Sequence, residues 1–179
     1  MRLGELIRLD DSRFLELAEA KGNGRILHAL LHPRVAPVAW FRIAHWLHAK
    51  GWRRLASCIC LLVLVVSGAE FPARAIIGHS FVLPHPNGVV IGSAEIGNRV
   101  TLFQHVTLGS RRLDGRYDLS LRPRLGHDVI VGAGATVLGP IGIGDGAVIA
   151  ANSLVLLDVP PGGHAIGVPA KVSPERSST

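Results

Sequence analysis

Aromatic side chains are scarce in this chain, and this scarcity limits how its interior can be filled. They make up 5% of the 179 residues, while 48% of the residues are hydrophobic and 21 are glycine. A core with few aromatic rings has to be built from Ile, Val, Leu and Ala, and so many glycines indicate many tight corners. This composition favours a repeat fold, in a chain long enough for one domain and a small accessory segment.

Cysteine is nearly absent as well, which argues against a fold stapled by disulfides. Cys58 and Cys60 are two positions apart in an apolar run, and side chains with this spacing on a helix diverge too far to bridge easily. We expect them to be buried free thiols in a reducing cytoplasm. The first residues, MRLGELIRLDDSRF, are charged rather than apolar, so they do not read as a secretory signal. The chain is therefore expected to be intracellular.

Long hydrophobic runs are also missing. The most apolar stretch, residues 55–66, reads LASCICLLVLVV and is shorter than the roughly 17 to 25 residues of a membrane-spanning helix. One interpretation is a helix packed under the end of the repeat domain or in an oligomer contact. The other is an interfacial anchor that gives residues 35–68 a peripheral contact with the inner face of the membrane. Its support is a set of flanking aromatic and basic residues: Trp40, Trp46, Trp52, Arg53 and Arg54.

The chain is basic, with a net charge of +6 and a pI near 10.3. Proteins that track nucleic-acid phosphates usually gather their basic residues in one stripe with stacking aromatics. Here Arg and Lys are scattered and the C-terminal half is nearly free of aromatics, so no nucleic-acid partner is expected. A small anionic ligand or an anionic lipid surface explains the sign of the charge equally well.

Helical spacing marks the N-terminal part of the chain. Apolar residues recur every three or four positions between about residues 12 and 31, and again on one broad face between 38 and 48. The pair His32-Pro33 separates these stretches, and Gly51 ends the second one. Residues 1–69 are therefore predicted to form a helical segment.

From Ala75 onward the apolar period changes to six residues, in two columns. These are Ile77, Leu83, Val90 (after one extra residue), Ile96, Leu102 and Leu108, and then Leu125, Val131, Val137, Ile143, Ile149 and Val155. A strand repeats every two residues and a helix every 3.6, so a period of six needs another geometry. Three short strands per turn stack these columns inside a triangular prism. Glycine often follows a column residue, as at Gly97 and Gly126, and we expect it there because it permits the backbone angles of the corners.

The prism is predicted to span residues 70–160. Its pattern breaks at residues 110–124, a polar stretch with five arginines, which we expect to form a loop directed outward from the coil. Such loops commonly carry functional residues. Residues 161–179 are expected to form a polar tail that leaves the coil at Pro160-Pro161.

Four blocks in the coil resemble a known family. HPNGVVIG, FQHVTLG, VGAGATVLG and GVPAKV, in this order, are similar to the serine acetyltransferases and, more closely, to the sugar O-acetyltransferases of the colanic acid type. The resemblance covers about residues 70–172. It implies an all-β left-handed parallel β-helix with an N-terminal α-helical segment, and an acyltransferase that uses acetyl-CoA. It also implies a homotrimer with active-site clefts between neighbouring prisms.

The resemblance also implies a histidine base, which His85 matches. An imidazole can take the proton of an acceptor hydroxyl as the oxygen attacks the thioester, because its ordinary pKa is close to neutral. Glu70 matches the acidic partner that fixes the tautomer of the base, with a simple cap residue as the alternative. His105 lies about one coil further on, where it either assists in the same cleft or packs at a corner.

The same resemblance points to a coenzyme A groove lined by Gly109, Ala133 and Ala151. Small residues leave a flat wall along which the pantetheine arm can lie. Lys171 matches a basic position near the nucleotide end, where an ammonium group favours the phosphates. Plain corner packing is the alternative for each alanine.

Three positions depart from the serine acetyltransferase pattern. Pro84 stands in place of an acidic residue before the histidine, and Leu121 and Arg122 in place of an Arg-His pair. Without these groups the pocket for an amino acid is incomplete. We therefore expect a sugar hydroxyl in surface polysaccharide biosynthesis as the acceptor. Serine O-acetyltransferase, in cysteine biosynthesis, is the alternative.

Two further hypotheses concern other classes of protein. One is a non-catalytic scaffold docked on a membrane. The other is a zinc lyase of the carbonic anhydrase kind, which needs three histidines converging on the metal. The spacing of His79, His85, His105 and His127 does not reproduce such a cluster, so no metal is expected.

Overall fold

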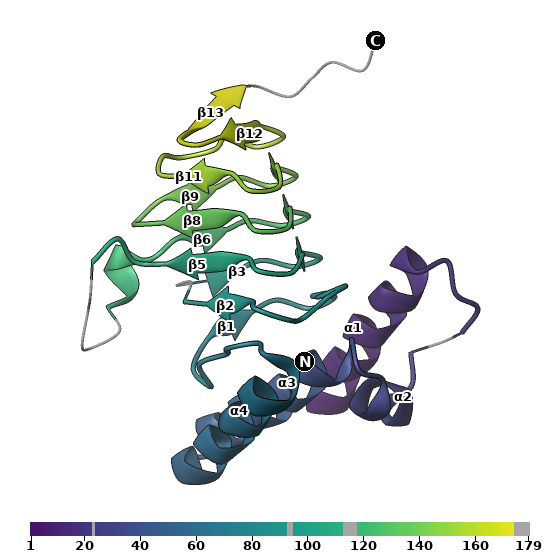
Figure 1. Cartoon of the computed structure of the whole chain (residues 1–179). Coiled ribbons are helices and arrows are strands. Elements are labelled where there is room, and N and C mark those ends of the chain that lie inside the picture. The colour runs from purple at the N-terminus through teal and green to yellow at the C-terminus, as the bar shows by residue number, and fades with distance from the viewer. Residues whose placement is uncertain (23, 93–94, 113–117, 174–179) are drawn as a thin grey trace.

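The computed structural model describes residues 1–22, 24–92, 95–112 and 118–173. Helices lie at one end of the molecule, and a coil of short strands rises from them towards the C-terminus (Figure 1). The middle of the predicted loop, residues 113–117, and the end of the predicted tail, residues 174–179, lie outside the described residues.

The N-terminal segment forms helices α1 (Leu3–Leu17), α2 (Ile26–Leu31), α3 (Ala36–Ala49) and α4 (Arg53–Ser67). The first helix begins earlier than the apolar spacing predicted, because Ile7 continues the buried stripe that includes Phe14. Pro37 lies in the first turn of α3, where its missing N–H is tolerated. Gly68, with a left-handed φ of 70°, ends α4. The helical character of this segment is as predicted.

The coil consists of strands two to four residues long. They are β1 (Ile76–Ile77), β2 (Val90–Ile91), β3 (Glu95–Ile96), β4 (Thr101–Leu102), β5 (Thr107–Gly109), β6 (Arg124–Leu125), β7 (Ile130–Val131), β8 (Thr136–Leu138), β9 (Gly142–Ile143), β10 (Val148–Ile149), β11 (Leu154–Val155), β12 (His164–Gly167) and β13 (Ala170–Ser173). A 3₁₀ turn, η1 (Leu119–Leu121), precedes β6.

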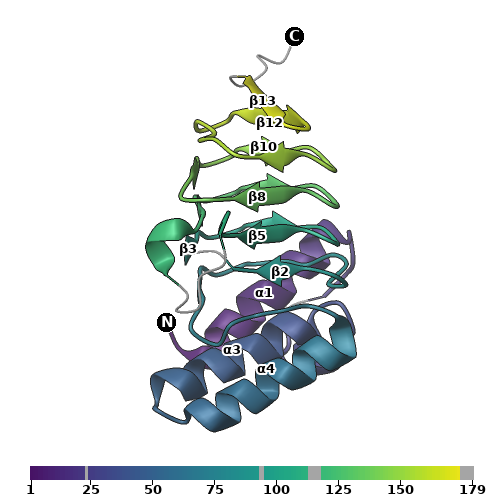
Figure 2. The ribbon, with the colours of Figure 1, turned by 60° about the vertical axis from the view of Figure 1, so that its left-hand side comes forward.

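These strands stack into three sheets, ordered β1-β3-β6-β9, β13-β12-β10-β7-β4 and β11-β8-β5-β2. Successive strands pass from one sheet to the next, so the chain winds around a three-sided prism that stands on the helices (Figure 2). The strand pairs are parallel except β12 with β13, an antiparallel hairpin that caps the coil. The three-sided coil predicted from the six-residue period is confirmed.

The core of the prism is formed by one inward residue from each strand. The predicted column residues are buried, with the exception of Val90, which is only half-buried. Ile91 takes its place in the core at 1% exposure and pairs in register with Leu108. Ile91 lies eight residues after Leu83, two more than one repeat, so the preceding turn inserts two residues. Ile96 follows only five residues later, so the net insertion of one residue agrees with the prediction, but the choice of Val90 as the core residue is wrong.

Glycine follows the column residues for a different reason than predicted. A Cβ on Gly97 would lie 2.3 Å from the Gly126 carbonyl oxygen, and one on Gly132 would lie 2.6 Å from the Ala151 nitrogen. The stacked coils leave no room for a Cβ at Gly97 and Gly132, so glycine is required at both positions. Left-handed φ values occur two positions further on, at residues such as Arg99 (φ 60°) and Asp128 (φ 56°).

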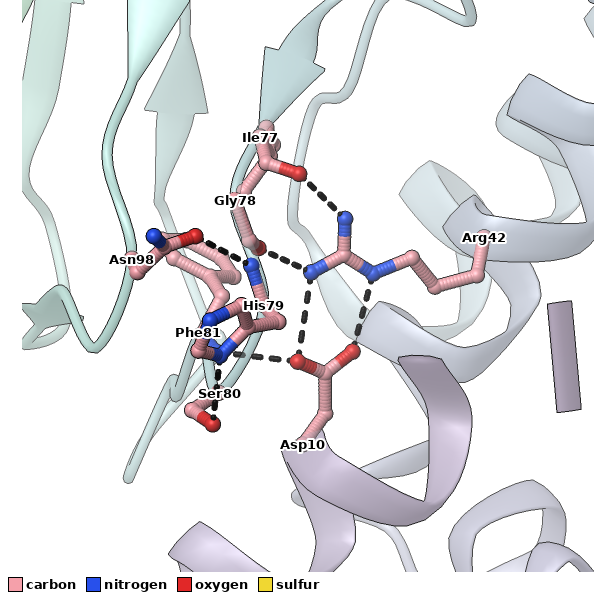
Figure 3. Close-up of polar contacts among 8 residues, drawn as sticks. All are labelled: Asp10, Arg42, Ile77, Gly78, His79, Ser80, Phe81 and Asn98. Carbon is pink, nitrogen blue, oxygen red and sulfur yellow. Dashed lines mark hydrogen bonds and ion pairs between the residues drawn. The ribbon is translucent and has the colours of Figure 1, made fainter. Parts of the chain in front are cut away.

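A buried ion pair joins the helices to the coil. Arg42 of α3 donates to both carboxylate oxygens of Asp10 in α1, with Nε–Oδ2 and Nη2–Oδ1 distances of 2.8 and 3.2 Å (Figure 3). The same guanidinium donates to the carbonyl oxygens of Ile77 at 2.6 Å and Gly78 at 2.5 Å. Asp10 also accepts the backbone N–H of Phe81 at 2.9 Å. One polar cluster thus fixes two helices to the first coil.

Water has almost no access to this ion pair. The Arg42 and Asp10 side chains are 3% and 2% exposed. Burial raises the pKa of the Asp10 carboxyl above its ordinary value, while the Arg42 guanidinium acts against that rise. Loss of either partner would leave the other without its counter-charge in a low-dielectric environment.

Helix α4 has an outward side that the coil does not cover. Ala56 and Val63 are buried, but most of its other apolar residues are exposed. Cys58 is exposed and Cys60 is half-buried, so the prediction of two buried thiols is wrong, because only one side of the helix faces the core. Burial raises the pKa of the Cys60 thiol. In the part of the chain that the structure describes, no helix combines the length and apolar character needed to cross a membrane.

Removing the arginine of the buried pair is expected to destabilise the fold strongly. Arg42→Ala leaves the Asp10 carboxylate buried and unpaired, which should lower the free energy of unfolding by about 3–5 kcal/mol, measured by urea denaturation. Arg99→Ala is the matched control. Arg99 pairs with Asp128 at the surface, where the side chains are 49% and 50% exposed, so its loss should lower the stability far less. Equal losses would contradict the role of the buried pair.

Adding one methyl group between stacked coils should also be costly. Gly97→Ala places a Cβ 2.3 Å from a backbone oxygen that cannot move aside easily, so we expect it to lower the free energy of unfolding by about 1–3 kcal/mol. Gly142→Ala is the control, because the nearest atom to its Cβ would be 3.9 Å away. If thermal or urea unfolding shows the same stability for both variants, close coil stacking is not the reason for glycine at this position.

Candidate active site

The turn that carries His85 lies where the helical segment meets the coil. The Gly88 N–H donates to the carbonyl of Gly68, the residue that ends α4, at 3.1 Å. Asn87 lies against Gly68, where an added Cβ would be 3.3 Å from the Asn87 Nδ2. The turn is thereby held against the end of α4, with His85 exposed on it.

His105 lies one coil further on, directly over this turn. Its backbone N–H donates to the Asn87 carbonyl at 3.0 Å. Its ring covers Gly88 so closely that a Cβ there would lie 2.2 Å from the His105 Nδ1, and Gly88 also has a left-handed φ of 69°. Gly88 is therefore required both for its backbone angle and for space. The structure brings His85 and His105 to the same edge of the coil.

Glu70 lies at the start of the sheet that contains β2. Its backbone N–H donates to the Val89 carbonyl at 2.8 Å, and its carbonyl accepts the Ile91 N–H at 3.0 Å. This pairing places Glu70 beside the strand that follows the His85 turn, with its side chain exposed. Within the described ranges, no hydrogen bond or ion pair joins the Glu70 carboxylate to His85. The two residues are neighbours along the coil but are not paired in the single chain.

A pocket of about 610 Å³ opens beside His85. Helices α2, α3 and α4 form one side, and the His85 turn forms the other. Its wall is mainly apolar and includes Leu31, Trp40, Leu62 and Val66. Sequence patterns missed this pocket, because helical spacing shows which residues share a face but not which faces of three helices meet.

The residues predicted to bind coenzyme A lie in three places. Ala133 and Ala151 are on the edge that carries His105, in successive coils, and the Asn152 N–H donates to the Ala133 carbonyl at 2.8 Å. Gly109 ends β5 on the opposite edge of the neighbouring sheet. Lys171 is exposed in β13, at the cap of the coil. One chain therefore groups the two alanines with His105 but separates them from Gly109.

Two arginines fasten the described ends of the predicted loop to the coil. The Arg111 Nε donates to the Leu138 carbonyl at 3.1 Å, and its Nη2 donates to a carbonyl in the next coil. Arg122 is buried, and its Nη1 donates to the Gly92 carbonyl at 2.9 Å. Sequence reasoning gave Arg111 no role and treated Arg122 only as a replaced histidine. In the sequence, only the high arginine content of the loop indicated that Arg111 and Arg122 have a role.

His79 and His127 lie on a different edge of the coil from His85 and His105. The His79 N–H donates to the Asn98 Oδ1 at 3.0 Å, and the Asn98 N–H donates to the His127 Nδ1 at 3.0 Å. These side chains link successive coils. In the described part of the chain, no three His, Cys, Asp or Glu residues lie close enough to hold a metal ion. The zinc lyase hypothesis therefore lacks its ligand cluster.

Known proteins were compared with this chain at the levels of sequence and structure. No protein-family model matches. The serine acetyltransferase of Helicobacter pylori (strain J99) is 41% identical over 143 residues, which cover 79% of this chain and 82% of that relative. The serine acetyltransferase of Mycobacterium tuberculosis is 41% identical over 142 residues, 79% of this chain and 61% of that relative.

Among solved structures, the serine acetyltransferase of Neisseria gonorrhoeae in complex with serine has a TM-score of 0.83 at 31% identity. The match covers 96% of this chain and 69% of that chain. The predicted fold class, a left-handed parallel β-helix with an N-terminal helical segment, is confirmed. The closer similarity to the colanic acid type is not shown.

The comparisons also correct the predicted acceptor. Polysaccharide acetylation was inferred from the departures at Pro84, Leu121 and Arg122, and this prediction is wrong, because the relatives at 41% identity are serine acetyltransferases. Departures at three positions do not outweigh a similarity that extends over most of the chain. The chain belongs to the serine acetyltransferase family.

Proposed function

We propose that this protein transfers the acetyl group of acetyl-CoA to the hydroxyl group of L-serine. The observation that carries the proposal is the 41% identity to serine acetyltransferases over a region that includes the His85 turn. The likeness to a serine acetyltransferase structure that contains serine supports the same acceptor.

In this proposal His85 is the general base. It takes the proton of the serine hydroxyl as the oxygen attacks the thioester carbon. The new carbon–oxygen bond forms, the carbon–sulfur bond breaks, and the imidazolium returns its proton to the departing thiolate. Support comes from the position of His85, exposed at the rim of a pocket on a turn that is held at Gly68 and at His105.

Glu70 is proposed as the residue that orients His85, and His105 as a second group facing the acceptor. A carboxylate that accepts one ring N–H fixes the tautomer and stabilises the imidazolium. Glu70 pairs beside β2, and His85 lies on the turn that precedes β2, which supports this assignment. Hydrogen bonds of this kind are often unformed until the substrate binds.

Acetyl-CoA supplies the activated acyl group, and four residues are proposed to hold it. The short side chains of Ala133 and Ala151 leave the backbone uncovered at one edge of the coil, so that backbone groups there can bind the pantetheine arm. Gly109 and Lys171 are not on that edge. If two prisms stand side by side, the alanine edge of one can face the Gly109 edge of its neighbour. This arrangement supports a homotrimer with shared clefts.

An acceptor assay tests the function directly. We expect the full chain to consume acetyl-CoA when L-serine is added and to release O-acetylserine, followed by the loss of thioester absorbance and by mass spectrometry. Thioester absorbance is preferable to a thiol reagent, because Cys58 is exposed and would react. Monosaccharides and nucleotide sugars are the comparison acceptors. Turnover with a sugar and none with L-serine would overturn the proposal.

His85→Asn should lower kcat for serine acetylation by about 10²–10⁴-fold, because the amide cannot accept the hydroxyl proton. His127→Asn is the matched control. His127 accepts a backbone N–H on another edge, and an asparagine oxygen can replace that acceptor. We expect kcat within about threefold of the wild type for this variant, and unchanged unfolding curves for both. A His85→Asn enzyme with full activity would exclude His85 as the base.

A further inference from the structure

The outward side of α4 carries a row of exposed apolar residues, here called the α4 stripe. Its members are Leu61, Leu62, Val65 and Val66, which are 61%, 55%, 75% and 77% exposed. Their spacing of three and four positions places them on one side of the helix, away from buried Val63. A surface of this kind on one helix of a folded chain indicates an interaction site.

Basic and aromatic residues border the α4 stripe at the turn between α3 and α4. Lys50, Arg53 and Arg54 are exposed there, and Trp52 is 64% exposed beside them. The sequence contains no Asp or Glu between Glu19 and Glu70, so no carboxylate of α2, α3 or α4 offsets these charges. The surface therefore combines an apolar row with an uncompensated positive charge.

This surface lies at the base of the molecule. Helices α3 and α4 run side by side below the coil, and the β12–β13 hairpin is at the opposite end (Figures 1 and 2). A flat partner can therefore approach α4 from the end of the molecule opposite the hairpin.

We propose that the α4 stripe docks this protein on an anionic lipid bilayer, with α4 lying in the plane of the interface. Apolar side chains enter the headgroup–acyl boundary, tryptophan sits at headgroup level, and Lys and Arg bind the anionic headgroups. A second copy of the chain fits less well. Two stripes facing each other would give Lys50, Arg53 and Arg54 no acidic partner, because α2, α3 and α4 contain no Asp or Glu.

Vesicle flotation of the full chain tests this proposal. We expect flotation with vesicles of phosphatidylcholine and phosphatidylglycerol, little with phosphatidylcholine alone, and weaker binding as salt is raised. The double variant Leu61→Glu and Val65→Glu should lose at least tenfold in binding, because two carboxylates oppose both insertion and charge attraction. Ile166→Glu is the control, an exposed apolar residue of β12 at the far end of the coil. It should bind like the wild type.

Failure of the wild type to float with anionic vesicles overturns the proposal, and so does unchanged binding of the double variant. Light scattering without lipid tests the other occupant, a second copy of the chain. If the double variant has a lower mass than the wild type and the Ile166→Glu control, the stripe is a contact between copies and the lipid proposal is overturned. Leu61 and Val65 do not line the pocket at His85. Serine acetylation without vesicles should therefore be unchanged in the double variant, which separates this test from that of the proposed function.

Discussion

The Asp10–Arg42 ion pair holds the helices to the coil, and the remaining arrangement depends on this junction. The guanidinium contacts two carbonyl oxygens of the first coil, and the carboxylate contacts one of its amides. Helix α3 carries Arg42 and leads through α4 to Gly68, whose carbonyl accepts the Gly88 N–H below His85. A polar cluster of this kind stabilises one geometry only when all its members are satisfied, because an unpaired charge would be costly in the interior.

The coil sets the second constraint, because parallel stacking repeats each corner at almost the same place in every turn. His105, Ala133 and Ala151 share an edge for this reason, although they are far apart in sequence. The same stacking leaves no room for side chains at Gly97 or Gly132. It also separates the predicted coenzyme A residues Ala133 and Gly109 onto different edges of one chain.

This chain departs from the serine acetyltransferase pattern at Pro84, Leu121 and Arg122. Pro84 and Leu121 carry no charge, and the Arg122 guanidinium donates to the Gly92 carbonyl. Beside His85 lies an apolar pocket instead, and Leu62 and Val66 belong both to its wall and to the α4 stripe. What binds the stripe therefore also touches residues of the pocket that His85 faces.

The sequence by itself determined the three-sided coil, because a six-residue apolar period fits only a prism, and it pointed to the His85 block through its resemblance. It misplaced the core residue at Val90, since the number of residues in a turn does not show in an apolar pattern. Only the tertiary structure decided the junction at Arg42, the pocket between three helices, and the exposure of Cys58. Each of these depends on which surfaces meet across long sequence separations, and local spacing carries no information about that.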